Sequence, residues 1–320
     1  MKKTSAKKKW GMRILTGLFF IVIAALLFNL VKNIEWAEVK NSLTQYETTQ
    51  LLLGFVVVTL SYFIFASYDL IGKYYTKHKL PARQILPLGI VCYAFNLNLS
   101  AWVGGIALRY RLYSRLGLKT EIITKVLSIS LISNWLGYII LAGSIFSLRL
   151  IDLPDNWTIG TSALQLIGSI LLAVAASYFI ACKFSKRRTF HIKKYKIELP
   201  SINFALIQAA LAMSNWMLMG LLLFRLFPDG TSYPAVLGIL LISSIAGIIT
   251  HIPAGLGVLE TIFITMLQGQ LTKSSILAAL IAYRILYFII PLAIATMIYA
   301  VMEIRAKEMK DVNNENKLIS

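Results

Sequence analysis

The sequence predicts an all-α, polytopic membrane protein with about six full spans and two re-entrant helical hairpins, arranged as an inverted-topology repeat. Hydrophobic residues make up 58% of the 320 residues and charged residues only 14%, and the mean hydropathy is +0.71. Most apolar residues fall in runs near the length of about 20 residues that crosses a bilayer. Two of the runs are interrupted in the middle by glycine and polar residues, at matching places about 150 residues apart, which is typical of transporters built from repeats.

The predicted spans are apolar runs with few charges, at about 14–31, 51–71, 122–148, 161–182, 202–226 and 276–302. The interrupted runs cover about 85–120 and 234–272. The first run follows a lysine-rich start, as a signal peptide would. It is long, however, and no small-x-small cleavage site follows it, so we predict a retained helix.

The net charge of +18 does not indicate a nucleic-acid partner. The basic residues lie in short patches between apolar runs, which is the pattern of cytoplasmic loops. By this rule the loops at 73–83 and 183–196 are inside, together with both termini. The loops at 32–50, 152–155 and 227–230 are predicted to be outside.

A full crossing by 85–108 would place the basic segment that follows it outside, against this charge rule. A re-entrant hairpin that returns to the cytoplasm removes the conflict, and its polar and glycine-rich break supplies the tip. The simpler alternative is a full crossing that breaks the rule once. For the tail to end inside, the segment 234–272 must enter from the opposite face.

These assignments divide the chain into a basic cytoplasmic N-terminus (1–13), a first membrane repeat (14–150), a second, inverted membrane repeat (151–303) and a cytoplasmic tail (304–320). Inverted repeats are the architecture of alternating-access transporters, whose site lies at the midplane between the halves.

Glycine and proline at the two breaks indicate a binding site for an anion. A helix that starts at membrane depth presents free N–H groups and the positive end of its dipole. Gly104 and Gly105 in the first break, and Gly255 and Gly257 in the second, allow close backbone approach. Pro253 suits a first helical position. We therefore predict a dry pocket for a phosphate-sized anion between the breaks.

Charged residues near the breaks have two interpretations each. Arg109 and Arg111 either attract anionic head groups at the cytoplasmic mouth or only flank the membrane. Glu260 and Arg284 are embedded charges that should not persist unpaired, so they form either a structural ion pair or part of a ligand or proton site. Asp69, near the inner end of its span, is expected to face the interface.

Three polar residues at the breaks complete the predicted site. His251 either couples to protons near neutral pH or is a hydrogen-bonded structural histidine. Asn96 and Asn98 either bind a head group or cap the break.

Nothing in the sequence indicates an enzyme. It has no P-loop, no Gly-x-Ser-x-Gly and no paired carboxylates in a polar context, so we predict no catalytic residue and no cofactor. Two separate cysteines within apolar runs and three scattered histidines indicate neither a disulfide framework nor a metal site.

The residues around both breaks carry a resemblance to a known family. The segments 93–98, 102–110 and 252–260 resemble the lysylphosphatidylglycerol synthase transmembrane-region family, the flippase half of bacterial aminoacyl-phosphatidylglycerol synthase/flippase proteins. The resemblance implies two repeats with re-entrant segments and movement of a phospholipid between leaflets. It assigns the family's glycine-rich turns to the four glycines above, its arginine to Arg109 and its glutamate to Glu260.

The two-part relatives carry a soluble aminoacyl-transferase domain that uses charged tRNA, and this chain ends without one. Synthesis of aminoacylated lipid is therefore not expected. The combined expectation is a flippase-like, multi-pass protein of the bacterial inner (cytoplasmic) membrane that moves or binds an anionic phospholipid. Two alternatives stay open: a transporter of a small polar anion, and a non-transporting membrane partner of a lipid-synthesis enzyme.

Overall fold

The structure is a computed structural model that describes residues 37, 41, 44–99, 101–151, 153, 160–186, 188–192, 195–250 and 255–303. The chain divides into two compact units, residues 1–45 and 46–320. In the first unit the Thr44 hydroxyl donates to the carbonyl of Asn41. The predicted N-terminal span at 14–31, the basic start and the tail from 304 lie outside the described residues. The following paragraphs concern the second unit.

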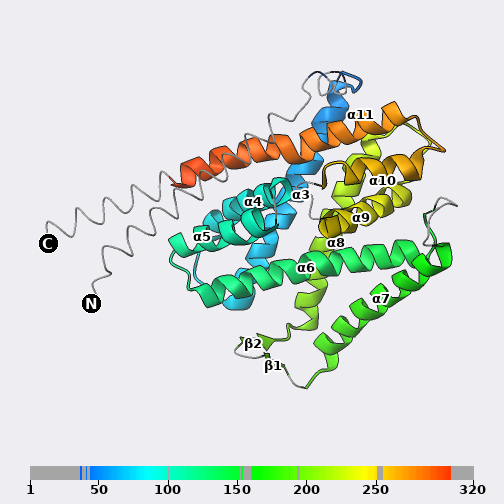
Figure 1. Cartoon of the computed structure of the whole chain (residues 1–320). Helices are drawn as coiled ribbons and strands as arrows, with labels where there is room; N and C mark the ends of the chain where they lie inside the picture. The colour runs from blue at the N-terminus through cyan, green and yellow to red at the C-terminus, as the bar shows by residue number, and fades with distance from the viewer. Residues whose placement is uncertain are drawn as a thin grey trace, which may run out of the picture. The chain divides into compact units, whose positions relative to one another are not determined.

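Helices form nearly all of the described part of this unit (Figure 1). The first half contains α3 (Thr48–Thr76), α4 (Ala82–Asn98), the π-helix η1 (Ala101–Ala107), α5 (Leu108–Arg115) and α6 (Thr120–Ser147). The second half contains α7 (Thr161–Phe184), the strands β1 (Thr189–Ile192) and β2 (Tyr195–Glu198), α8 (Ile202–Leu226), α9 (Tyr233–Thr250), α10 (Val258–Leu267), α11 (Lys273–Arg284) and the π-helix η3 (Ile285–Ile289). Helix then continues to Glu303.

Six of the described helices are long and apolar enough to cross a membrane: α3, α6, α7, α8, α9 and the continuous helix Lys273–Glu303. The predicted all-α, polytopic membrane fold is thereby confirmed. Five of these helices match predicted spans. The sixth, α9, was predicted as one arm of the second hairpin and reaches 18 residues. How deeply that hairpin enters a bilayer therefore stays a prediction.

Helices α3 and α8 form an antiparallel pair at the centre of the unit (Figure 1). At one end of the pair, the Tyr46 hydroxyl donates to the carbonyl of Leu226 at 2.9 Å. At the other end, the Tyr75 hydroxyl donates to the carbonyl of Glu198, just before α8, at 2.6 Å. The second helix thus runs against the first along its whole length.

The other elements pack around this pair in corresponding ways. Helix α4 packs on α3 as α9 packs on α8, and α5 contacts α6 as α10 contacts α11. In Figure 1 the hairpin of α4 and α5 and the hairpin of α9 and α10 lie on opposite sides of the central pair, and α6 and α11 run in opposite directions. Helices α8, α9 and α11 each start about 150 residues after α3, α4 and α6. These correspondences agree with the predicted repeat, but the inverted orientation of the two halves across a membrane stays a prediction.

Each hairpin begins and ends at the same end of the molecule. His78, just before α4, has its ring 6.3 Å from the ring of Tyr113 in α5. We call this the basic end, because the lysines that close α3 lie there. Arg115, at the end of α5, forms an ion pair there with Glu303, the last described residue of the long C-terminal helix.

The segments before α9 and after α10 meet at the opposite end of the molecule. Gly230 and Ser232 line one cavity together with Leu267 and Gln270. Within this unit, the described loops predicted to be inside thus gather at the basic end, and those predicted to be outside gather at the opposite end. The orientation of the two ends across a membrane stays a prediction.

The predicted inner loop at 183–196 contains a short antiparallel hairpin, with Thr189 opposite Glu198 and Ile192 opposite Tyr195. Because β2 ends next to the last turns of α3, this hairpin also belongs to the basic end.

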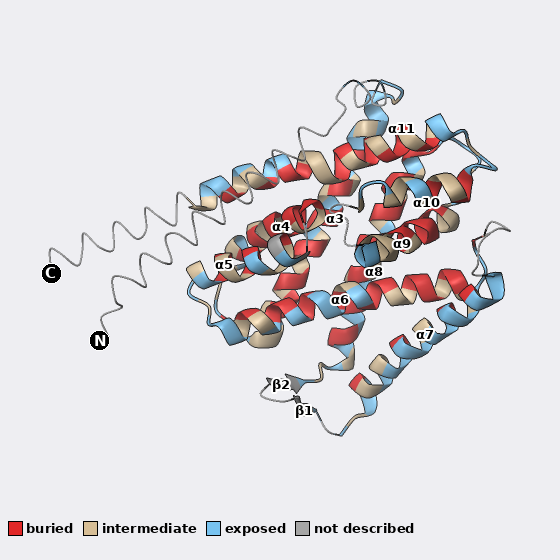
Figure 2. Ribbon diagram, viewed as in Figure 1, coloured by how far each residue is buried: buried red, intermediate tan, exposed pale blue. Residues whose placement is uncertain are grey.

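The surface is apolar along the helices, as expected for a protein solvated by lipid. Helix α7 exposes most of its length, including Leu166, Ile170 and Phe184. Helix α4, by contrast, is largely buried (Figure 2). Within the hairpin, α4 is therefore shielded from lipid by its neighbours.

The topology generates a labelling prediction. We expect Ser114→Cys, in α5, to react with a membrane-impermeant maleimide only from the cytoplasm, and Ser274→Cys, at the start of α11, only from the periplasm. Both serines are exposed, and the two native cysteines are buried, so background labelling is low. Labelling of Ser114→Cys from the periplasm would contradict the predicted hairpin entry.

Candidate functional site

The first arm of the first hairpin ends at Leu99, the C-cap of α4, before the glycines. Gly104 lies in η1 with its backbone against α4, and a Cβ on it would sit 2.1 Å from the carbonyl carbon of Phe95. A Cβ on Gly105 would lie 2.6 Å from Oδ1 of Asn96. These two glycines let the two arms of the hairpin pack closely together, and the predicted approach of an anion to them stays a prediction.

Asn98 joins this tip to the other half of the protein. Its Nδ2 donates to the carbonyl of Ala94 at 2.8 Å and to the carbonyl of Phe288 in η3 at 3.2 Å. In a π-helix the register of backbone bonding shifts, and carbonyls are left for other donors. Of the two interpretations of Asn98, this geometry supports the capping role, since the side chain is buried and engaged.

Arg109 lies inside the protein and not at an open mouth. Its Nη2 is 3.0 Å from Oδ1 of Asp69, and its Nε donates to Oδ2 at 3.2 Å. The hydroxyl of Tyr113 donates to the same Oδ2 at 3.0 Å. The exposed fractions of the Arg109 and Asp69 side chains are 4% and 0%. The expectation that Asp69 faces the interface is wrong, because the carboxylate balances a guanidinium that could not otherwise be buried.

The other arginines of α5 lie nearer the surface. Arg111 Nη2 is 3.5 Å from Oε1 of Glu303, and Arg115 pairs with the same carboxylate. These contacts connect the end of the first hairpin to the last described turn of the C-terminal helix. The basic end is thereby closed by ion pairs that are partly exposed.

The turn of the second hairpin depends on glycine for its backbone conformation. Gly255 and Gly257 have φ of 59° and 79°, in the left-handed region. A Cβ on either would meet no described atom within 4 Å, and the predicted approach of an anion to these glycines stays a prediction. His251 and Pro253, both predicted site residues, lie outside the described residues.

Glu260 and Arg284 form a two-pronged ion pair. Arg284 Nε donates to Glu260 Oε1 at 2.6 Å, and Nη2 donates to Oε2 at 3.0 Å. Nη2 also donates to the carbonyl of Gly255 at 3.1 Å. Of the two interpretations of these charges, the ion pair is present, and a role in ligand or proton handling stays a prediction. The ion pair pins the turn of the second hairpin to α11.

The helix ends at the breaks are not open. The N–H of Gly257 donates to Glu260 Oε2 at 2.9 Å, so α10 caps its own N-terminus. Ala107 has helical φ and ψ, so the backbone continues from η1 into α5 without a free end at Leu108. The expectation of helix N-termini that open directly onto an empty anion pocket therefore does not hold at these two positions.

A buried polar network between the halves was not predicted from the sequence. The Ser61 hydroxyl donates to Asn215 Oδ1 at 2.8 Å and lies 2.7 Å from the Tyr287 hydroxyl, which is 2.8 Å from that of Tyr93. The Tyr62 hydroxyl donates to the carbonyl of Tyr287 at 3.0 Å. These groups come from α3, α4, α8 and η3 and hold the two halves together. The sequence signal for this network was the presence of polar side chains within apolar runs. The sequence does not show which of them pair, because the hydrogen-bonded side chains are at least 122 residues apart in the chain.

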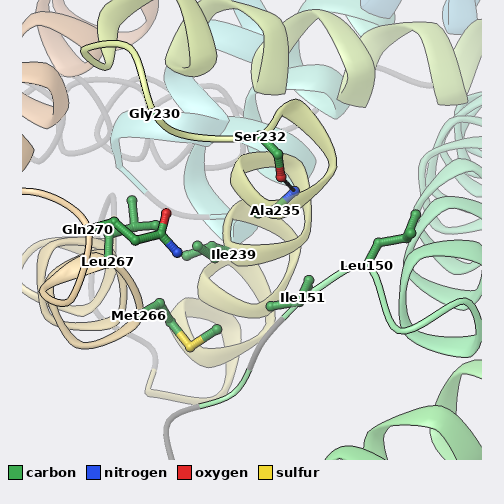
Figure 3. A pocket seen from close by; sticks show the side chains of 9 residues that line it. All are labelled: Leu150, Ile151, Gly230, Ser232, Ala235, Ile239, Met266, Leu267 and Gln270. Carbon is green, nitrogen blue, oxygen red and sulfur yellow. Dashed lines mark hydrogen bonds between the residues drawn. The ribbon is translucent and has the colours of Figure 1, made fainter.

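Two cavities lie apart from the predicted residues. One, of about 290 Å³, is at the opposite end and is lined by Leu150, Ile151, Gly230, Ser232, Ala235, Ile239, Met266, Leu267 and Gln270 (Figure 3). The other, of about 490 Å³, is an apolar groove between α3 and α8. Among the described residues, no cluster of histidine, cysteine or carboxylate side chains could hold a metal ion.

Comparison with known proteins gives the family. Residues 14–295 match the model of the lysylphosphatidylglycerol synthase TM region. The chain belongs to this family. It is 46% identical to the inner membrane protein YbhN of Escherichia coli, over 98% of this chain and 99% of that protein. It is also 30% identical to the uncharacterized protein slr0712 of Synechocystis, over 84% of each chain. The membership supports a membrane protein with a lipid-related role.

The packing at the first tip predicts a strong effect of a single methyl group. We expect Gly104→Ala to destabilise the protein by about 1–3 kcal/mol or more, because the added Cβ must push the two arms apart. Gly269→Ala is the matched control, since a Cβ there meets no described atom within 4 Å. Thermal unfolding in detergent, followed by tryptophan fluorescence, measures both. Equal Tm values for the two variants would contradict the packing.

The two carboxylate clusters predict unequal effects of charge removal. We expect Glu260→Gln to cost about 1–3 kcal/mol, because it weakens a bidentate pair and the cap of α10. Glu303→Gln should cost less than about 1 kcal/mol, because its ion pairs are more exposed. The same unfolding assay compares them. A larger loss for Glu303→Gln would show that the second hairpin is not held by its ion pair.

Proposed function

We propose that this protein moves an anionic phospholipid between the leaflets of the bacterial inner membrane. One observation carries the proposal: two helical hairpins enter the bundle from opposite ends, and each brings a charged residue to an ion pair within it. Ionisable side chains inside a membrane protein are costly and mark substrate pathways as a rule. The family membership supports a lipid-related role, and the similarity to the inner membrane protein YbhN supports a place in the inner membrane.

Arginine is suited to this role by its geometry. The guanidinium binds carboxylate and phosphate oxygens in the same forked manner, so a lipid phosphate can replace a carboxylate at the same nitrogen atoms. Arg109 and Arg284 now hold Asp69 and Glu260. In the proposed cycle each arginine exchanges its internal partner for the head group as the halves move.

The acyl chains of the lipid would stay outside the protein. The surfaces of α3 and α8 are apolar, and the groove between them is lined by residues such as Leu60, Ile64 and Leu221. An apolar groove of this kind is suited to contact with lipid acyl chains. The head group alone would then pass along the hairpins, and the anionic substrate would be drawn first to Arg111 and Arg115 at the basic end.

The proposal is tested by lipid movement in proteoliposomes. Fluorescent phosphatidylglycerol is placed in one leaflet, and its exposure to an impermeant quencher is followed over time. We expect the wild-type protein to speed exchange over empty vesicles, and Arg109→Ala and Glu260→Gln each to slow it at least tenfold. The control is Glu121→Gln, which removes an exposed carboxylate in the first turn of α6.

Three outcomes separate the alternatives. Equal rates in all samples and in empty vesicles would remove the flippase proposal. Uptake of a small soluble anion without lipid movement would support a solute transporter instead. Stable copurification with a lipid-synthesis enzyme, with no effect of Glu260→Gln, would support a non-transporting partner.

A further inference from the structure

The Asp69–Arg109 cluster has properties that go beyond binding. It is a fully buried ion pair with a third polar group, the Tyr113 hydroxyl, on the carboxylate. The carboxylate comes from a spanning helix and the guanidinium from the hairpin, so any movement of the hairpin against α3 must separate the two charges or move them together.

From this cluster we infer that the protein couples lipid binding to protons: Asp69 takes up one proton for each anionic head group that Arg109 binds. The inference rests on the proposed function. The lipid is defined here by its chemistry, a phosphodiester with one negative charge.

Charge balance gives the reason. With Asp69 ionised, the pair is neutral overall, and adding a phosphodiester would leave one uncompensated negative charge in a low-dielectric interior. When the Asp69 carboxylate binds a proton, its charge is removed, and the phosphate becomes the only anion facing Arg109. The guanidinium keeps its own protons, because arginine is not deprotonated in proteins. One proton and one lipid anion thus enter together, and the cluster stays neutral.

The other groups around the cluster leave Asp69 as the one that changes charge. Tyr113 faces it from α5, and Cys92 of α4 interacts electrostatically with both Asp69 and Arg109. Tyrosine and cysteine side chains are neutral near pH 7 in their ordinary ranges. A further titratable group, His78, lies beside Tyr113 at the basic end, with Lys73 close to it.

His78 marks the route by which a proton reaches the cluster. It is 6% exposed, its ring is 6.3 Å from that of Tyr113, and its Nδ1 accepts a hydrogen bond from the N–H of Leu80 at 3.3 Å. Its Nε2 is buried with no hydrogen-bond partner among the described residues. A buried ring nitrogen with no partner among these residues is available to exchange a proton on the side of the cluster that the Tyr113 ring faces. Burial and the charge of Lys73 lower the pKa of His78, so the ring is neutral near pH 7.

Binding measured against pH tests the inference. The purified protein in detergent is titrated with fluorescently labelled phosphatidylglycerol at several pH values between about 5.5 and about 8. The phosphodiester keeps its negative charge over this whole range. We expect the affinity to rise as pH falls, by up to about tenfold per pH unit where one proton is linked. Asp69→Asn, which mimics the protonated acid, should bind with the low-pH affinity at every pH. Glu121→Gln should keep the wild-type pH dependence.

A second measurement uses the unaltered protein, because Asp69→Asn leaves Arg109 buried without its counter-charge and can fail to fold. In weakly buffered solution with a pH indicator, lipid addition should cause uptake of up to one proton per lipid bound. Binding of equal affinity at all pH values, without proton uptake, would overturn the coupling and leave the proposed function intact. Absence of binding at every pH would overturn both.

Discussion

The structure depends on the pairing of charges within an apolar bundle. Arg109 would be very costly to bury alone, and its pairing with Asp69 pins the first hairpin to α3. Glu260 and Arg284 pin the second hairpin to α11 in a corresponding way. In both cases one partner belongs to the hairpin and the other to a spanning helix, so each hairpin is fixed to a spanning helix by an ion pair.

Buried backbone groups must also be paired within an apolar bundle, and the π-helix η3 shows how this is done. Regular α-helices satisfy every carbonyl internally, and a π-helix leaves some to other donors. In η3 the carbonyls of Tyr287 and Phe288 accept from Tyr62 and from Asn98, which lie in α3 and α4. The interruption in the C-terminal helix is thus bonded to the first half of the protein. Close contact between the halves is maintained by side chains that reach across, and not by small residues alone.

The sequence predicts the course of the chain better than its contacts. Apolar length and loop charge predicted α8 to the residue and grouped the described loops into the two sets that the structure brings together. Partners were harder to predict, since they depend on packing. Asp69 has its partner 40 residues away, in a hairpin whose basic residues look like ordinary flanking charges. The ion pair of Glu260 was predictable because both charges lie in apolar runs and had few candidates for pairing.

The described conformation is closed at the basic end and hollowed at the opposite end. Arg111 and Arg115 connect the first hairpin to Glu303, while the cavity of about 290 Å³ opens between the second hairpin and the loop after α6. A transporter with two states needs contacts at one end that weaken as those at the other end form. Partly exposed ion pairs are suited to this, because water replaces them at little cost. The buried Asp69–Arg109 pair is not, since it can separate only if another anion or a proton takes over one of its charges. In the proposed transport cycle, the exposed pairs would therefore control opening, and the buried pair would make that opening depend on the substrate.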